Sequence, residues 1–487
     1  MSGTKTALGA AAIAALALSA PTEVNAASKK HTALPQTAAW TGDFDGMQKR
    51  RLVRIIVPYS KTIYFIDKGE QLGVAAQLGQ ELEKSLNKGV KKEVERIRVA
   101  FIPTPRDKLL SALNEGRGDI VAANLTITPL RLKDVDFTKA GITGVREVLV
   151  TGPSAPDIGR LEDLSGKDLY MRKSSSYREH LDALNAKWRM QGIKPIRLRD
   201  ADEHLEDEDL MEMVNAGLLP YAIVDDHKAQ IWAKVLPSLK VRGELAINEA
   251  GEIGWAMRKN SPLLKAKLDD FLEQHSAKAD ALIAYVIKRY YSQDKMVRRA
   301  YAPDEMKKFE ELIGYFKRFG DQYGFNHLMI LAQGYQESAL NQKLRSKAGA
   351  VGIMQLLPST ARIKEVNITG VESSAERNIE AGNKYLRHLI QVYIDDPAFD
   401  AKNQTLFAFA AYNAGPNNLK KFRARAETMG LNPNIWFDNV ENAAAAIIGR
   451  ETVQYVSNIY KYYIAYQMES ERRVEAERAR QGATQTK

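Results

Sequence analysis

Residues 327–338 read HLMILAQGYQES and decide the fold of the second half of the chain. Apolar residues recur there at helical spacing, so the stretch predicts a helix. Ile330 and Glu337 are seven residues apart and share one face, on which Gly334 should leave open space. A carboxyl group beside apolar neighbours acquires a raised pKa, which suits a general acid. Because a single helical glutamate is usually a solvated surface residue, this interpretation of Glu337 depends on other motifs.

Four sequence motifs follow one another in this half. They are Glu337-Ser338, Gly352-Ile353-Met354-Gln355, Ala411-Tyr412-Asn413-Ala414-Gly415, and Glu451-Thr452 with Tyr455-Val456. In this order and spacing they resemble the soluble-lytic-transglycosylase domain of murein-cleaving enzymes, over residues 314–466. One such motif alone is a weak signal, whereas four in order are specific. The resemblance implies an all-α, goose-lysozyme-like domain.

The resemblance also implies an activity. Enzymes of this family cut the β-1,4 bond between N-acetylmuramic acid and N-acetylglucosamine in peptidoglycan glycan strands, and Glu337 matches their catalytic residue. It would protonate the leaving oxygen and then accept the proton of the muramyl C6 hydroxyl as that oxygen closes on C1. The product would be a 1,6-anhydromuramyl end. The motifs contain no second acidic residue near Glu337, which suits one carboxylate rather than the pair of ordinary glycosidases.

Four other motif residues match substrate-binding positions of the family. By resemblance, Gln355, Tyr412 and Asn413 hydrogen-bond the sugars and orient Glu337, and Ser346 contacts the acetamido group. Asn413 also precedes Gly415 and a proline, a good helix stop, so a purely structural role stays open for it.

Three further motif residues are not placed in the catalytic set. Met354 is expected in the groove wall or the core. Glu451 matches a family position but also suits a helix-end ion pair, and Tyr455 is expected to pack under the groove.

The first half of the chain alternates short β-branched runs with helical patterns. The strand candidates are 52–57, 97–102, 120–123, 147–150 and 221–224, and the helix candidates between them include 75–87 and 106–115. This alternation is typical of an α/β domain with a largely parallel sheet. From residue 277 onward helical periodicity dominates, so the second half should be all-α.

Residues 118–131, GDIVAANLTITPLR, resemble the first lobe of the amino-acid-type periplasmic solute-binding proteins. In that family the residue that matches Arg131 clamps a ligand carboxylate, a task suited to a planar guanidinium, and Thr126 would assist it. The resemblance spans residues 52–272 and implies a two-lobed α/β binding module for a muropeptide or an amino acid.

The second lobe offers two more candidate ligand-binding residues. Ser174 opens a serine run ahead of a helix that begins near Tyr177, where hydroxyl and free N–H groups suit an anion. Asp225 ends a predicted strand and matches the position that holds a ligand ammonium.

Three observations leave the ligand chemistry open. The acidic pair that the family usually shows after Gly73 is replaced by Ala75 and Gln77. Arg131 also suits a surface ion pair with a nearby aspartate, Asp134 or Asp136. The acidic run 202–209 is interpreted as a solvated helix start rather than a metal site.

The composition narrows the function further. The chain has 487 residues, a formal charge of +10 and 45% hydrophobic residues, which is ordinary for globular proteins. A charge of +10 over this length is a weak field, so no nucleic acid partner is expected. The absence of cysteine excludes disulfides, thiolate nucleophiles, iron–sulfur clusters and a lipidated N-terminal cysteine. The histidine spacing and the missing phosphate-binding motifs indicate no metal and no cofactor.

Residues 1–26 have the layout of a signal peptide: Lys5, an apolar run over 7–20, and Val24-Asn25-Ala26 as the cleavage site. We therefore expect an exported, periplasmic protein, and the resemblance allows a peripheral association with the outer membrane. The predicted layout is a signal peptide over 1–26, a linker over 27–50, a solute-binding-protein-like domain over 51–275, connecting helices over 276–312, a lytic transglycosylase domain over 313–468, and a charged tail over 469–487.

A binding domain ahead of a catalytic domain resembles the architecture of the membrane-bound lytic transglycosylase F family, in which the front domain is thought to sense cell-wall peptides. Two other functions stay open. The first is a periplasmic solute-binding sensor whose helical half anchors it to murein, which would not need Glu337. The second is a lysozyme-type hydrolase on the same fold, which would leave reducing ends.

Overall fold

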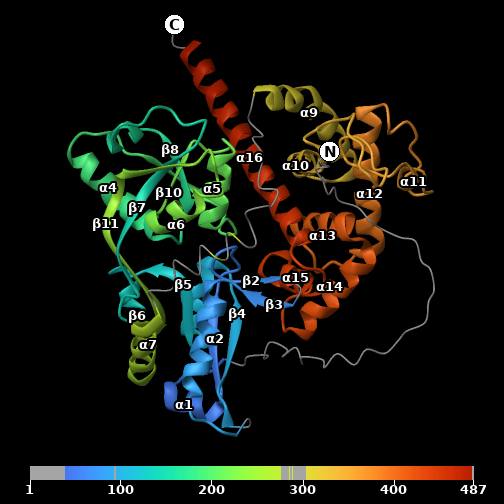
Figure 1. Cartoon of the computed structure of the whole chain (residues 1–487). Helices are drawn as coiled ribbons and strands as arrows, with labels where there is room; N and C mark the ends of the chain where they lie inside the picture. Colours follow the sequence, from blue (N-terminus) through green and yellow to red (C-terminus); the bar gives the residue numbers. More distant parts are fainter. Residues whose placement is uncertain are drawn as a thin grey trace, which may run out of the picture. The chain divides into compact units, whose positions relative to one another are not determined.

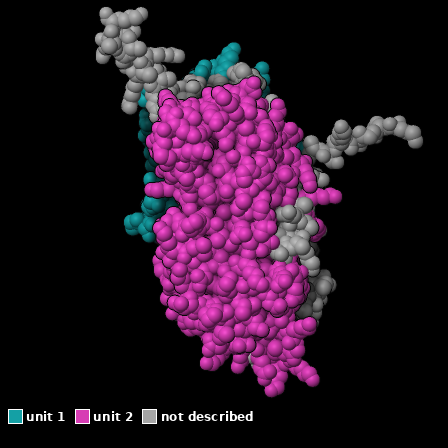
Figure 2. Space-filling view, turned by 90° about the vertical axis from the view of Figure 1, so that its left-hand side faces the viewer, with its two compact units in different colours: residues 1–33, 302–421, 454–487 teal, residues 34–301, 422–453 magenta. Residues whose placement is uncertain are grey.

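The computed structural model describes residues 39–67, 69–92, 95–275, 285, 288 and 303–484. The chain divides into two compact units (Figure 2). The helical unit combines Ala302–Lys421 with Gln454–Lys487, and the α/β unit combines Leu34–Tyr301 with Phe422–Val453. The predicted signal peptide lies outside the described residues, as does most of 276–302 within the predicted connecting helices over 276–312. The predicted domain boundaries stay a prediction.

The α/β unit is built on one mixed sheet (Figure 1). Its strand order is β10-β7-β11-β5-β1-β4, with β6 paired to β11. The strands are β1 Leu52–Val57, β4 Arg98–Pro103, β5 Ile120–Thr126, β6 Val135–Phe137, β7 Ile142–Thr151, β10 Tyr221–Asp225 and β11 Lys240–Arg258. Two further pairs are β2 Phe65–Asp67 with β3 Glu70–Leu72, and β8 Asp168–Arg172 with β9 Arg197–Ala201.

The sheet corrects one prediction. β1 is parallel to β4 and β5, but β11 is antiparallel to β5, β6 and β7, and β10 is antiparallel to β7. The expected largely parallel sheet is therefore wrong. Hydrophobic patterns locate strands along the chain but do not record the direction of the strand next to them.

Two lobes share the long strands β7 and β11. The first lobe adds helices α2 Val74–Leu86, α3 Leu109–Asn114 and α7 Pro262–His275 to β1, β4 and β5. The second lobe adds α4 Ser176–Met190, α5 Asp207–Asn215 and α6 Asp226–Trp232 to β8, β9 and β10. One end of β11 pairs with β5 of the first lobe, and its other end pairs with β7 beside β10 of the second.

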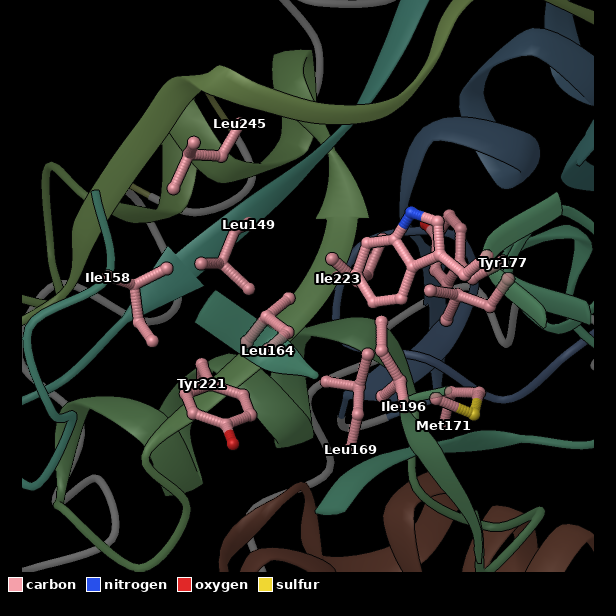
Figure 3. Close-up of a cluster of buried hydrophobic side chains, with 12 residues drawn as sticks. Leu149, Ile158, Leu164, Leu169, Met171, Tyr177, Ile196, Tyr221, Ile223 and Leu245 are labelled. Carbon is pink, nitrogen blue, oxygen red and sulfur yellow. The ribbon is translucent and has the colours of Figure 1, made fainter. Parts of the chain in front are cut away.

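The core of the second lobe fixes the strands that carry cleft residues (Figure 3). Leu149 of β7, Leu169 and Met171 of β8, and Ile223 of β10 belong to one cluster of buried apolar side chains, each at most 1% exposed. β8 ends at Arg172 and β10 ends at Asp225. The packing of these strands therefore fixes the backbone positions of the two charged residues.

The end of the predicted linker 27–50 is a helix instead. Helix α1 spans Phe44–Arg50, and its Phe44 and Met47 are buried. The Asp43 carboxylate caps α1 and also accepts the Leu264 N–H of α7 at 2.8 Å. These contacts attach α1 to the first lobe, and its two buried apolar residues, three positions apart, lie on one face of the helix.

The described residues from 303 onward confirm the predicted all-α half. The helices are α9 Pro303–Tyr323, α10 His327–Ser338, α11 Pro358–Ala361, α12 Ala375–Tyr393, α13 Ala401–Ala414, α14 Pro416–Thr428, α15 Glu441–Ile448 and α16 Glu451–Thr484. Helix α10 has the predicted bounds. The Asn326 side chain caps its first turn, and Ala339 ends it in a left-handed conformation.

Residues 422–453 lie in the α/β unit, although the predicted catalytic domain includes them. The ring of Phe437 lies 4.9 Å from that of His204, between centroids. The Arg450 N–H donates to Asp67 Oδ1 at 3.2 Å. Asp438 and Glu441 are buried, with Asp438 in a left-handed conformation at φ +60°. This segment therefore packs on the solute-binding fold.

We expect Asp438→Asn to stabilise the protein much more at pH 7.5 than at pH 4.5. Burial raises the pKa of Asp438 to about 6; Glu206 and Asp107 act in the same direction, and His204 opposes them. The folded state thus holds a proton that the unfolded state releases near pH 4, so stability falls as the pH rises from about 4 to about 6.

Asparagine removes this loss and tolerates a left-handed backbone. The gain at pH 7.5 should be about 2–3 kcal/mol. Thermal melts of both proteins at the two pH values measure it, and an equal difference at both would contradict the assignment.

Candidate functional site

Glu337 lies in the last turn of α10 and is half-buried. The Tyr455 hydroxyl, from the first turns of α16, donates to Glu337 Oε1 at 2.5 Å. Gln333 lies one turn before Glu337, and its Nε2 donates to the Tyr455 oxygen at 3.1 Å. Gln333 is 0% and Tyr455 is 7% exposed, so this chain of hydrogen bonds fixes one carboxylate oxygen from a packed interior.

Tyr455 remains a donor at ordinary pH. Burial raises its pKa well above the usual range, and the negative charge of Glu337 raises it further. Burial and Glu337 also raise the pKa of Tyr412. The expectation that Tyr455 only packs under the groove is therefore incomplete, since its hydroxyl bonds to Glu337.

A tight turn at residues 352–355 faces the end of α10. The Tyr412 hydroxyl of α13 donates to the Met354 carbonyl oxygen at 2.8 Å. The Met354 N–H donates to Asn378 Oδ1 at 2.8 Å, and the Ser338 hydroxyl donates to the Ile353 carbonyl oxygen at 2.9 Å. Thus three of the four sequence motifs meet at this turn.

Gly352 and Gln355 both have positive φ. Gly352 is at φ +77°, and a Cβ there would lie 2.4 Å from Asn378 Nδ2, so no other residue fits without a shift. Gln355 is at φ +44°, and its Nε2 donates to the carbonyl oxygens of Gly352 at 2.8 Å and Leu344 at 3.2 Å. Its side chain is thus held against its own turn.

Gly334 does not leave open space, which corrects the prediction. A Cβ at this buried glycine would lie 3.0 Å from both Ile353 and Phe316. The glycine therefore allows the 352–355 turn to approach α10 closely. The space expected over Glu337 is not on this stripe of the helix.

Ser346 and Asn413 have separate positions. Ser346 lies in the loop after α10, is half-buried, and accepts the Ala350 N–H on its hydroxyl oxygen at 3.0 Å. Asn413 is half-buried in the last turn of α13, next to Tyr412. Glu451 is exposed at the first residue of α16, one turn before Tyr455.

A polar cleft in the α/β unit contains all four ligand-binding candidates of the first half. Thr126 and Arg131 line it from the first lobe, and Ser174 and Asp225 from the second. The other charged lining residues are Arg106, Asp107, Arg172, Asp207 and Lys228. The structure thus brings the predicted residues together.

Arg131 is buried rather than in a surface ion pair with Asp134 or Asp136. It is 9% exposed, and its guanidinium donates to the carbonyl oxygens of Thr126 at 2.8 Å and Ser174 at 3.0 Å. Arg131 therefore bridges the two lobes through two carbonyl oxygens and a longer contact, 3.9 Å, with the Glu179 carboxylate.

Asp225 is the last residue of β10, as expected, but its carboxylate already has partners within the protein. Its Oδ2 accepts Asn124 Nδ2 at 2.9 Å and lies 3.1 Å from Lys228 Nζ. Sequence reasoning missed Lys228, although its position three residues after Asp225 on α6 was a usable signal. Ser174 also differs from expectation, because its hydroxyl donates to Glu203 and Ser175 is the helix cap.

The acidic run 202–209 is not a solvated helix start. Glu206, Asp207 and Glu208 are 3–5% exposed and face cations or hydroxyls. Arg106 Nη2 lies 2.5 Å from Glu206, Arg172 Nη2 lies 2.5 Å from Asp207, and the Ser60 hydroxyl donates to Glu208 at 2.6 Å. In the described part of the chain, no cluster of histidine and carboxylate side chains is placed to hold a metal.

The missing acidic pair after Gly73 leaves an apolar cavity. Val74, Ala75 and Leu78 line it together with Trp255, and Asn124 borders both this cavity and the polar cleft. An aliphatic group therefore has a place beside the polar groups.

Comparisons with known proteins match the two halves of the chain to two families. Residues 314–435 match the model of the Transglycosylase SLT domain, and residues 54–293 match that of the bacterial extracellular solute-binding proteins, family 3. An ancestral arginine-binding protein bound to arginine has 23% identity and a TM-score of 0.39 over 50% of this chain and 99% of its own. A TM-score this low carries no argument about ligand.

Relatives that match across both halves of the chain were also found. "Membrane-bound lytic murein transglycosylase F" of Shewanella woodyi is 30% identical over 382 residues, which cover 73% of this chain and 74% of the relative. The protein of the same name in Stutzerimonas stutzeri is 26% identical over 449 residues and 86% of both chains. Across the residues that the structure describes, no helix has the length and apolar character needed to cross a bilayer. The motifs, the two-part fold and these relatives agree, and the chain belongs to the membrane-bound lytic murein transglycosylase F family.

Proposed function

We propose that Glu337 is the catalytic acid and base of a peptidoglycan lytic transglycosylase. The observation that carries this proposal is the buried hydrogen-bond chain from Gln333 through Tyr455 to Glu337 Oε1. Because Tyr455 donates to Oε1, the transferable proton of Glu337 resides on Oε2. A fixed carboxyl group with a defined proton position is what general acid catalysis requires.

The reaction balances with this one carboxyl group. Oε2 gives its proton to the oxygen that links N-acetylmuramic acid to N-acetylglucosamine, and the bond from C1 to that oxygen breaks. The carboxylate then takes the proton of the muramyl C6 hydroxyl, and the C6 oxygen bonds to C1. Glu337 regains its proton, no water is consumed, and the product is a 1,6-anhydromuramyl end.

The other groove residues bind the sugars or support the residues that do. The Tyr412 hydroxyl donates its hydrogen bond to the Met354 carbonyl oxygen, so Tyr412 positions the 352–355 turn that carries Gln355. We place Gln355, Asn413 and Ser346 in contact with the sugars, together with Tyr412 as their support. In the α/β unit, Thr126, Arg131, Ser174 and Asp225 bind a muropeptide or amino acid, and this binding regulates access to the Glu337 groove.

The proposed location is the periplasm, with peripheral association to the outer membrane. The signal-peptide pattern of residues 1–26 supports export. The names of the relatives support membrane association. Cell fractionation of the tagged full-length chain tests it.

The chemistry is tested by mass spectrometry of intact murein sacculi digested with the purified protein. Fragments that end in 1,6-anhydromuramic acid are expected. Reducing ends would instead assign a lysozyme-type hydrolase, and binding without cleavage would assign a murein-anchored sensor. Repeating the digest with added cell-wall peptides tests regulation, because an unchanged rate would contradict it.

Tyr455→Phe should lower kcat by about 10² while KM changes little, because the carboxyl group loses the donor that holds it. Gln333→Met should cause a smaller loss in the same direction. The rates come from timed release of soluble muropeptides at several pH values. A wild-type rate and pH profile for Tyr455→Phe would contradict the positioning role.

A further inference from the structure

The polar cleft of the α/β unit already contains an ammonium group. Lys228 Nζ lies 2.6 Å from Asp207 Oδ2 and 3.1 Å from Asp225 Oδ2, and its side chain is 7% exposed. Burial lowers the pKa of Lys228, but Asp207 and Asp225 more than offset this effect and raise it overall. Lys228 therefore stays charged and neutralises Asp225, the residue expected to hold a ligand ammonium.

The remaining charges of the cleft leave a place for one anion. Arg106 pairs with Glu206, Arg172 pairs with Asp207, and Asp107 pairs with Lys108, which does not line the cleft. Arg131 donates to two carbonyl oxygens, and its guanidinium lies 3.9 Å from Glu179. Burial lowers the pKa of Arg131, and Glu179 offsets this effect only in part. A ligand carboxylate would supply a counter-ion closer than Glu179.

Two buried atoms at the cleft lack hydrogen-bond partners. Asp225 Oδ1 needs a donor and Arg172 Nε needs an acceptor, and their side chains are 1–3% exposed. A peptide group offers one N–H and one carbonyl oxygen. An ammonium would satisfy Asp225 but would add a cation beside Lys228 and Arg172, which is unfavourable in a buried site.

We propose that the cleft selects an N-acylated peptide with a free carboxylate over the same peptide with a free amine, and that Lys228 sets this selection. The inference rests on the proposed ligand binding in this cleft and specifies its ligand class. The carboxylate pairs with Arg131, the acylated N–H donates to Asp225 Oδ1, and a carbonyl oxygen accepts from Arg172 Nε.

The experiment compares L-alanyl-D-isoglutamine with its N-acetyl derivative by isothermal titration calorimetry on the full-length protein. The two probes differ in charge at their amino end. At pH 6.5 the free amine, with a pKa of about 7.7–8.0, is protonated, whereas the N-acetylated nitrogen is neutral. The N-acetyl probe should bind at least about tenfold more tightly. Lys228→Arg should keep this preference, and Lys228→Met should abolish or reverse it, with thermal melts as the check on folding.

Equal or tighter binding of the free-amine probe to the wild-type protein would overturn the selection while leaving ligand binding intact. Heat from neither probe would overturn the proposed ligand binding and the selection with it. Because the wild-type comparison decides by itself, the test does not depend on the folding of Lys228→Met.

Discussion

Glu337→Gln should reduce the release of anhydromuropeptides from sacculi by at least about 10³-fold, the scale of a lost acid and base. The amide keeps the shape of the side chain and can still accept the Tyr455 hydroxyl, so folding and murein binding should persist. The amide cannot give a proton to the leaving oxygen or take one from the C6 hydroxyl.

The measurement is a timed digest followed by mass spectrometry, with a sedimentation assay for binding to sacculi. Glu311→Gln, at an exposed glutamate of α9, is the matched control and should release products at the wild-type rate. Cleavage by Glu337→Gln at more than a tenth of the wild-type rate would assign the chemistry to another group.

Asp207→Asn should lower the free energy of unfolding of the α/β unit by about 3–5 kcal/mol, because it leaves two buried cations with too little negative charge. Asp207 is 3% exposed and pairs with Arg172 at 2.5 Å and Lys228 at 2.6 Å. Lys228 and Arg172, with the help of Arg106, hold the pKa of Asp207 far below its usual range, although burial opposes them.

The sign of the pH dependence follows from this lowered pKa. The stabilisation is complete above the unfolded pKa near 4 and declines as the pH falls below it, so the variant and the wild type should converge in acid. Urea unfolding at pH 7 and pH 3 measures the difference. Asp182→Asn, on an exposed carboxylate of α4, is the control and should change stability by less than about 0.5 kcal/mol. A loss below 1 kcal/mol for Asp207→Asn would show that the ion pairs of Asp207 with Arg172 and Lys228 do not stabilise the α/β unit.

The elements of the fold could be predicted because their signals are local. Helix α10 has its predicted bounds, because its apolar spacing and its cap at Asn326 both depend only on residues close together in the sequence. The direction of β7 and β11 could not be predicted, because it depends on strands at least 70 residues away, such as the pairing of Tyr221 with Thr151 and of Ile253 with Thr126.

The site was predicted in part for the same reason. The motifs predicted Glu337 and Tyr412 as site residues, but no pattern shows where the hydroxyl of Tyr455 points. The acidic run 202–209 was misinterpreted because its cations, Arg106, Arg172 and Lys61, come from distant positions. A dense run of carboxylates is usually solvated, and only the tertiary structure shows that this one is neutralised.

The position of residues 422–453 matters for how such proteins evolve and are engineered. Phe437 and Arg450, which contact His204 and Asp67, lie between two motifs of the transglycosylase sequence. A fragment that starts at residue 303 would carry this segment without the surface that buries Phe437, Asp438 and Glu441. Exchange of the front domain for that of a relative would therefore have to preserve that surface, so the two halves of this chain are not interchangeable modules.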